Sequence, residues 1–111
     1  MTSRQLKYIL DIERVIQELI WIQDRFDNDF EKFKSDFMGV RAAERAFEIL
    51  GEALNKLQKI EPKIEIKNAA EIIGLRNLIA HAYDTIDVKI LWSILIQDIP
   101  NVKEEIDQLK N

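Results

Sequence analysis

The sequence contains no cysteine and, among its 111 residues, only one histidine, three glycines and two prolines. Without cysteine the chain cannot form disulfides, thiolate nucleophiles, iron–sulfur clusters or cysteine zinc sites. The single histidine, His81, excludes a multi-histidine metal site within one chain. We therefore expect neither a metal nor a cofactor, and the missing cysteine fits a reducing, cytoplasmic location.

Long hydrophobic runs are also missing. The longest apolar stretch, from about Ile90 to Ile96, is interrupted by Ser93 and is too short to cross a bilayer. Charged residues near the start stand where a signal peptide needs an apolar run. With 16 basic and 20 acidic residues the net charge is −4, which disfavours unselective binding to nucleic acid. We expect a soluble protein that binds neither membrane nor DNA, and any polyanion site must be local or assembled from several chains.

The residue types that are abundant in the sequence favour helices, and this composition predicts an all-α fold in one domain, residues 1–111. The architecture we expect is an antiparallel bundle of four to five helices. The last of these is kinked near Pro100 or divided there into two helices in near-continuation. Apolar spacing and helix breakers predict helices over residues 4–26, 38–60 and 66–83, with a short helix or bend between the first two, and a last helix whose apolar stripe runs from Leu91 to Leu109.

The helix expected over residues 38–60 has one polar side. Its charged residues fall within roughly 120° of arc on a helical wheel, opposite the apolar ones. By default such a stripe is a solvated face, and the alternative is that it forms one wall of a cleft. The residues of this stripe that we consider for a cleft are Arg41, Glu44, Arg45 and Glu48.

The segment from Gly74 to Tyr83 breaks the bundle pattern. Arg76 and Asn77 fall among apolar positions of the wheel, where a guanidinium must find a partner or line a cavity. On a regular helix His81 points about 140° away from Arg76. These two side chains can therefore meet only at an irregular helix end, or when they belong to different chains.

Each of these residues also has a purely structural interpretation. His81 near a helix C-terminus can be a favourable partner of the helix dipole. Arg76 can pair with Glu48 or Glu52 across a helix interface, which would make the chain a plain helical interaction protein. Tyr83 can be an aromatic plug with its hydroxyl at the rim.

Residues 76–83, with the sequence RNLIAHAY, resemble the R-x4-H-x-Y motif of the HEPN superfamily, specifically its HepT-like toxin branch. Residues 45–54, RAFEILGEAL, resemble the G-E-A segment of that branch. The C-terminal pattern is matched by Tyr83, the turn at Asp87, Trp92 and the sequence Asp98-Ile99-Pro100. The resemblance spans nearly the whole chain, with Leu75 as the one departure we find.

The resemblance implies a helical homodimer that cleaves RNA without a metal, as the toxin of a type VII-like toxin–antitoxin pair. It implies that the partner is a minimal nucleotidyltransferase antitoxin, which silences the toxin by transferring AMP onto the motif tyrosine. The catalytic pair of the family carries over to Arg76 and His81, and the modified tyrosine to Tyr83. Asn77, which follows the arginine, is the candidate for orienting the substrate.

These residue types suit metal-free cleavage, in which the ribose 2′-hydroxyl attacks the phosphate. Histidine transfers protons near neutral pH, and arginine stabilises the charge on the phosphoryl oxygens. One imidazole cannot be acid and base at the same moment, so a two-fold dimer that brings both copies of Arg76 and His81 into one cleft is expected. The alternative is a non-catalytic HEPN subunit that binds a nucleotidyltransferase, a nucleotide or both.

Overall fold

The computed structural model describes residues 1–81 and 86–110, and these residues form six α-helices. The helices are α1 (Ser3–Arg25), α2 (Phe30–Lys34), α3 (Phe37–Ile60), α4 (Ala69–His81), α5 (Val88–Gln97) and α6 (Ile99–Leu109). The predicted all-α fold is confirmed. The structure has more helices than the expected four to five because α2 is a separate helix and the last helix is divided.

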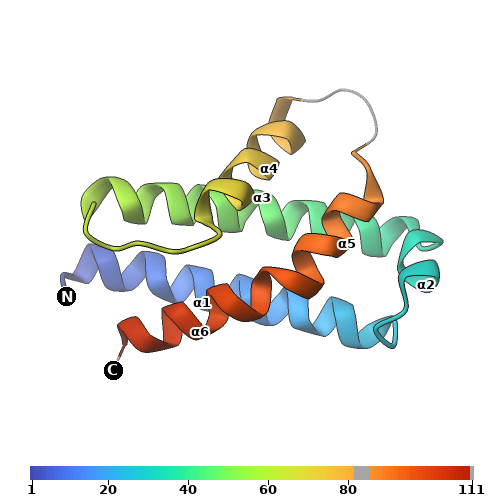
Figure 1. Ribbon diagram of the computed structural model, residues 1–111, viewed down its shortest axis with the longest axis horizontal. Helices are drawn as coiled ribbons and strands as arrows, with labels where there is room; N and C mark the ends of the chain where they lie inside the picture. Colours follow the sequence, from blue (N-terminus) through green and yellow to red (C-terminus); the bar gives the residue numbers. More distant parts are fainter. Residues whose placement is uncertain (82–85, 111) are drawn as a thin grey trace.

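The two long helices, α1 and α3, lie side by side and antiparallel along the long axis of the molecule (Figure 1). Helix α4 packs on α3, and its C-terminal end projects beyond the other helices. Helices α5 and α6 follow one another across the bundle, and α6 packs against α1. The core between them is built from fully buried aliphatic and aromatic side chains, the largest being Phe33, Phe47, Ile9, Ile12, Leu19, Leu50, Leu54, Leu57, Ile72, Leu91, Leu95 and Ile99.

Short polar side chains fix where the helices begin. Asp29 caps α2 by accepting a hydrogen bond of 2.9 Å from the backbone N–H of Glu31. Asp36 caps α3 in the same way, with the N–H of Gly39 at 2.8 Å. The break between α1 and α2 is confirmed, and Asp27 and Asn28 turn the chain there with φ angles of 55°.

Helix α4 begins at Ala69, three residues later than the predicted start at residue 66. The backbone N–H of Lys67 donates to the carboxylate of Glu105 on α6, with distances of 3.0 and 3.3 Å to its two oxygens. Ile66 is buried in the core. The segment before Ala69 is therefore held by long-range contacts, which local sequence patterns do not reveal.

The chain changes direction at Asp98, where α5 ends and α6 begins. Pro100 stands in the first turn of α6, where its missing N–H leaves no hydrogen bond unmade. Of the two predicted alternatives, the pair of successive helices is the one that forms. None of the helices in the described part of the chain combines the length and apolarity needed to cross a membrane.

Candidate active site

Helix α4 approaches α3 closely where Arg76 meets Gly51. A Cβ atom at position 51 would overlap the Cβ of Arg76, and it would lie 3.0 Å from the Arg76 Cγ. It would also lie 3.1 Å from the backbone oxygen of Ile72. Glycine at this position therefore lets the stem of Arg76 lie directly on the backbone of α3.

The Arg76 guanidinium lies at the edge of this contact. The residue is half-buried, and its Nη1 donates a hydrogen bond of 3.0 Å to Oδ1 of Asn77. Its Nε is buried and has no hydrogen-bond partner among the described residues. A guanidinium carries five N–H donors, and the contacts among the described residues use one of them, so Arg76 has donors left to bind an anion.

The structure does not form the cross-helix ion pair considered for Arg76. The Glu48 carboxylate pairs with Arg45 at 3.0 Å, and the Glu52 carboxylate pairs with Lys56 at 3.0 Å. Both acids thus have partners on their own helix. Within residues 1–81 and 86–110, the interpretation of Arg76 as a buried ion-pair anchor is therefore not supported.

Positive charge nevertheless gathers around Glu52. The hydrogen bond from Lys56 lowers the pKa of Glu52 most, the Lys56 charge adds to this, and the more distant charges of Arg76 and Arg45 act in the same direction. Glu52 in turn raises the pKa of Lys56, through the same hydrogen bond and its own charge. The charge of Arg76 on α4 therefore acts on the pair of Lys56 and Glu52 on α3.

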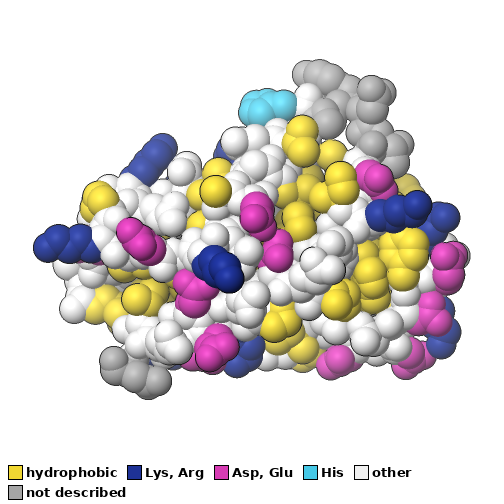
Figure 2. All heavy atoms as spheres, in the orientation of Figure 1, with side chains coloured by type: hydrophobic (Ala, Val, Ile, Leu, Met, Phe, Trp, Pro, Cys, Tyr) yellow, Lys and Arg dark blue, Asp and Glu magenta, His cyan; other side chains and the backbone are white. Residues whose placement is uncertain are grey.

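His81 is the last residue of α4 and is exposed. Figure 2 shows the imidazole, coloured cyan, on the outside of the projecting end of the helix. Because α4 is helical through His81, the expected separation of about 140° from Arg76 applies. No hydrogen bond in the described part of the chain joins the two side chains, so one chain does not bring the predicted pair together.

Two further residues of the predicted site follow Arg76 in the sequence. Asn77 is exposed and accepts the hydrogen bond from Arg76 described above. Tyr83, the predicted site of modification, lies outside the described residues. The turn expected after it is described from Ile86 onward, where Asp87 caps α5 by accepting from the N–H of Lys89 at 2.9 Å.

The polar stripe of α3 lies on the surface beside this region. Arg41 pairs with Glu44 at 3.4 Å, and Arg45 pairs with Glu48 at 3.0 Å. Both arginine side chains remain about two-thirds exposed. Exposed pairs of this kind contribute little stability, so the arginines remain able to exchange partners with an incoming anion.

Sequence reasoning gave Lys56 no role, considered Glu52 only as a partner of Arg76, and noted Gly51 only as part of the G-E-A segment. Gly51 falls on the apolar side of α3, where a glycine costs helix stability unless another group needs the space. A glycine on the apolar side of a helix is thus a sequence signal that another group packs closely at that position. The pairing of Glu52 with Lys56 follows the ordinary i, i+4 spacing on a helix.

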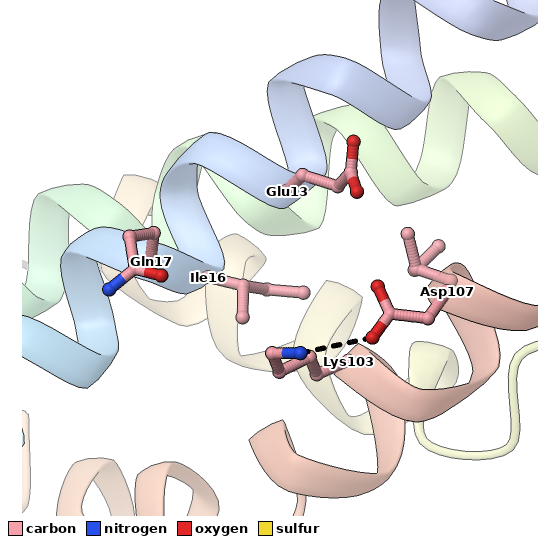
Figure 3. A pocket seen from close by; sticks show the side chains of 6 residues that line it. Glu13, Ile16, Gln17, Lys103 and Asp107 are labelled. Carbon is pink, nitrogen blue, oxygen red and sulfur yellow. Dashed lines mark hydrogen bonds and ion pairs between the residues drawn. The ribbon is translucent and has the colours of Figure 1, made fainter. Parts of the chain in front are cut away.

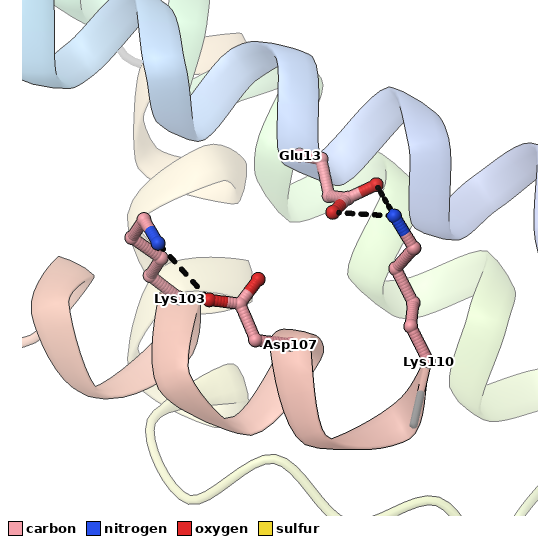
Figure 4. A network of polar contacts seen from close by, with 4 residues as sticks. All are labelled: Glu13, Lys103, Asp107 and Lys110. Carbon is pink, nitrogen blue, oxygen red and sulfur yellow. Dashed lines mark hydrogen bonds and ion pairs between the residues drawn. The ribbon is translucent and has the colours of Figure 1, made fainter.

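The hollows on the described surface include three that lie between helices. The first, of about 200 Å³ between α1 and α6, is lined by Glu13, Ile16, Gln17, Lys103, Ile106 and Asp107 (Figure 3). Its charges are already paired, with Lys103 bound to Asp107 and Lys110 to Glu13 (Figure 4). The pair between Lys110 and Glu13 joins the end of α6 to α1, so these charges stabilise the contact between the two helices.

The second hollow, of about 160 Å³, lies between α1 and α3, and Glu52 and Lys56 belong to its lining. The third, of about 390 Å³, lies between the start of α2 and α5. No cluster of three or more His, Asp and Glu side chains able to hold a metal ion occurs within residues 1–81 and 86–110.

The chain is similar in sequence to a family of ribonucleases. The family described as "Ribonuclease HepT-like" matches residues 7–109. The chain is 33% identical to "Putative RNase MJ1380" of Methanocaldococcus jannaschii, covering 96% of this chain and 98% of that protein. It is also 33% identical to "Probable ribonuclease HepT" of Thermococcus cleftensis, over 86% of this chain and 89% of that protein. No solved structure matches the chain.

Proposed function

Because this chain belongs to the HepT-like ribonuclease family, we propose that it is a metal-independent endoribonuclease whose cleft is assembled from two copies of the chain. The observation that carries this proposal is the geometry of α4. Arg76 is held on Gly51 with an Nε that has no partner in the described part of the chain, while His81 stands exposed on the projecting end. The helix therefore displays both side chains but does not bring them together.

A second copy of the chain would complete the site. The last turn of α4 carries Leu78, whose side chain is 55% exposed although the helix is strongly apolar. An exposed apolar surface beside functional groups is typical of a protein interface. Two-fold packing of these ends would bring two imidazoles and two guanidinium groups into one cleft, and it would concentrate positive charge that one acidic chain lacks.

The proposed reaction needs only proton transfer and charge stabilisation. One His81 accepts the proton of the ribose 2′-hydroxyl, whose oxygen attacks the adjacent phosphorus. The other His81 donates a proton to the departing 5′-oxygen, giving a 2′,3′-cyclic phosphate and a free 5′-hydroxyl. The Arg76 guanidinium groups donate hydrogen bonds to the phosphoryl oxygens as their charge increases. Asn77, bonded to Arg76, holds the guanidinium in place.

We also propose that the protein is the toxin of a toxin–antitoxin pair controlled at Tyr83. A nucleotidyltransferase antitoxin would transfer AMP from ATP to the tyrosine oxygen, releasing pyrophosphate. Tyr83 follows His81 by two residues, so the attached phosphodiester would lie near the groups that receive the RNA phosphate. The added anion would occupy those donors and repel the RNA backbone.

The proposed activity is tested with purified, unmodified protein and total RNA in EDTA, with the His81→Ala variant as control. We expect the wild type to cleave RNA under these conditions, leaving cyclic phosphate ends, and the variant to lose most of this activity. A chain that binds a nucleotidyltransferase or nucleotide but cleaves no RNA would instead be a non-catalytic HEPN subunit.

A further inference from the structure

The largest of the three hollows differs from the others in its chemistry. It is lined by Phe30, Lys89, Trp92, Ser93, Ile96 and Gln97, and we call it the aromatic hollow. Its volume of about 390 Å³ lies within the range of sites that bind small molecules, roughly 300–1,000 Å³. Figure 2 shows hydrophobic side chains exposed over α5, the helix that supplies most of this lining.

The aromatic rings of the hollow are held in place from beneath. The indole of Trp92 packs on the fully buried ring of Phe33, with centroids 5.0 Å apart and planes inclined by 32°. Phe30 stands beside Trp92, with centroids 6.2 Å apart and planes inclined by 52°. Both Phe30 and Trp92 remain partly exposed. They form a fixed surface on which a flat ring can stack without reorganising the core.

A row of polar side chains borders this surface. Lys89, Ser93 and Gln97 follow one another at intervals of four residues, so they lie along one side of α5. The row provides an ammonium group, a hydroxyl and an amide, which together can meet a phosphate and both donors and acceptors on a base edge. A groove built only to bury an apolar protein segment does not need this row.

A short connection in the chain joins the proposed cleavage site to the start of α5, next to the aromatic hollow. Val88, the first residue of α5, follows His81 by seven positions, so their Cα atoms lie at most roughly 25 Å apart. The end of α4 and the start of α5 lie at the same end of the molecule in Figure 1. A single strand bound at His81 can span this distance within a few nucleotides.

We infer that the aromatic hollow is an accessory subsite that binds one unpaired base of the RNA substrate, beside the cleavage site. The inference rests on the proposed function, because it takes RNA as the ligand. The base stacks on Phe30 and Trp92, its edge meets Ser93 and Gln97, and Lys89 binds the neighbouring phosphate. The protein thereby favours single-stranded over paired RNA, since a base within a duplex cannot reach the rings.

The subsite is tested with a short oligoribonucleotide that carries 2-aminopurine and 2′-O-methyl groups. The methyl groups prevent attack by the 2′-oxygen, so binding is measured without cleavage. Stacking on the aromatic rings should quench the 2-aminopurine fluorescence. We expect Phe30→Ala to weaken binding about tenfold. Lys89→Ala should weaken it several-fold and should also reduce its dependence on salt.

Two matched variants serve as controls. Trp21→Ala removes an aromatic side chain that is 62% exposed on α1, outside the hollow. Lys103→Ala removes the same charge as Lys89→Ala, from the hollow between α1 and α6. Both should bind the probe as the wild type does. If circular dichroism shows that Phe30→Ala has lost helix content, that variant cannot be interpreted. The binding of Lys89→Ala and Gln97→Ala, which change exposed side chains, then decides whether the hollow binds the base.

Three outcomes are informative. Equal binding by the hollow variants and the control variants overturns the inference. So does a change in oligomeric state of the hollow variants, seen by light scattering, with unchanged binding, because the hollow would then be a protein interface. If the wild type binds the probe with the expected dependence on Phe30 and Lys89 but cleaves no RNA, the proposed nuclease function fails and the base-binding inference stands.

Discussion

Gly51 of α3 lies against the stem of Arg76 of α4, so closely that no side chain fits between the two helices at this point. This contact fixes where the α4 backbone crosses α3. It also fixes where the guanidinium leaves the helix interface and reaches the surface. The placement of the proposed catalytic arginine thus depends on a residue of another helix that has no chemistry of its own.

A methyl group at this position should therefore be harmful. We expect Gly51→Ala to lower the free energy of unfolding, because overpacking costs roughly 1–3 kcal/mol and outweighs the gain in helix propensity, about 1 kcal/mol. Gly74→Ala is the matched control, since a Cβ there meets nothing within 4 Å. It should stabilise the fold by about 0.5–1 kcal/mol. Urea unfolding of both variants measures the difference, and equal effects would contradict the close contact.

The proposed catalytic pair leads to a second prediction. Arg76→Ala and His81→Ala should each abolish most RNA cleavage and relieve any growth inhibition, while circular dichroism shows an unchanged helix content. Arg76→Lys should also be poor, because an ammonium group cannot reproduce the forked donors of a guanidinium. Near wild-type cleavage by either alanine variant would show that the side chain is not catalytic.

A third prediction concerns the stability of the junction between α5 and α6. Burial of the Asp98 carboxyl raises its pKa above the usual 3.8, and a hydrogen bond to the Glu71 side chain and the charge of Glu71 add to the shift. The folded state therefore holds this proton more tightly than the unfolded state does. The contribution of Asp98 to the free energy of unfolding is greatest below pH 3.8 and falls as the pH rises through the raised pKa.

Replacement of this carboxyl tests the relationship. Asp98→Asn should be more stable than the wild type at pH 7, and the advantage should shrink as the pH is lowered towards 3.8. Thermal unfolding across this range provides the measurement. Glu65→Gln, which removes an exposed carboxyl outside the helices, should change stability little at any pH. An Asp98→Asn variant that is less stable than the wild type at pH 7 would contradict the assignment.

The switch proposed at Tyr83 gives a fourth prediction. Tyr83→Phe should keep much of the nuclease activity, because the hydroxyl has no catalytic role in the proposed reaction, and it should escape neutralisation by the antitoxin. Mass spectrometry after incubation with the cognate nucleotidyltransferase and ATP locates the adenylyl group. Its appearance on another residue, or continued ATP-dependent silencing of Tyr83→Phe, would disprove the switch.

The sequence alone predicts most of the helices because their signals are local. Apolar spacing defines α1 and α3 within one residue at each end, and Asp29 and Asp87 are recognisable caps. The late start of α4 is different, since it depends on a hydrogen bond from Lys67 to Glu105, 38 residues away. The same reason explains why Arg76 could not be predicted as the residue that contacts Gly51: the partner depends on how two helices cross.

The sequence alone proposes the residues of the candidate site but does not predict their surroundings. A single helix places Arg76 and His81 on different sides, and this follows from helical geometry. The pairing of Glu52 with Lys56 rather than with Arg76 depends on choices among several nearby charged groups. The alternative ion pairs that exposed charges can form differ little in free energy, so the spacing in the sequence does not predict which of them forms.

The central claim is that two chains build one cleft in which both imidazoles are needed. The most direct test is a mixed dimer of one wild-type chain and one His81→Ala chain, purified through two different affinity tags. Its RNA cleavage per dimer is measured in EDTA beside both parent dimers. The shared cleft predicts activity close to that of the doubly substituted dimer, because one imidazole cannot serve as acid and base. Half of the wild-type activity would show that each chain works alone and would contradict the claim.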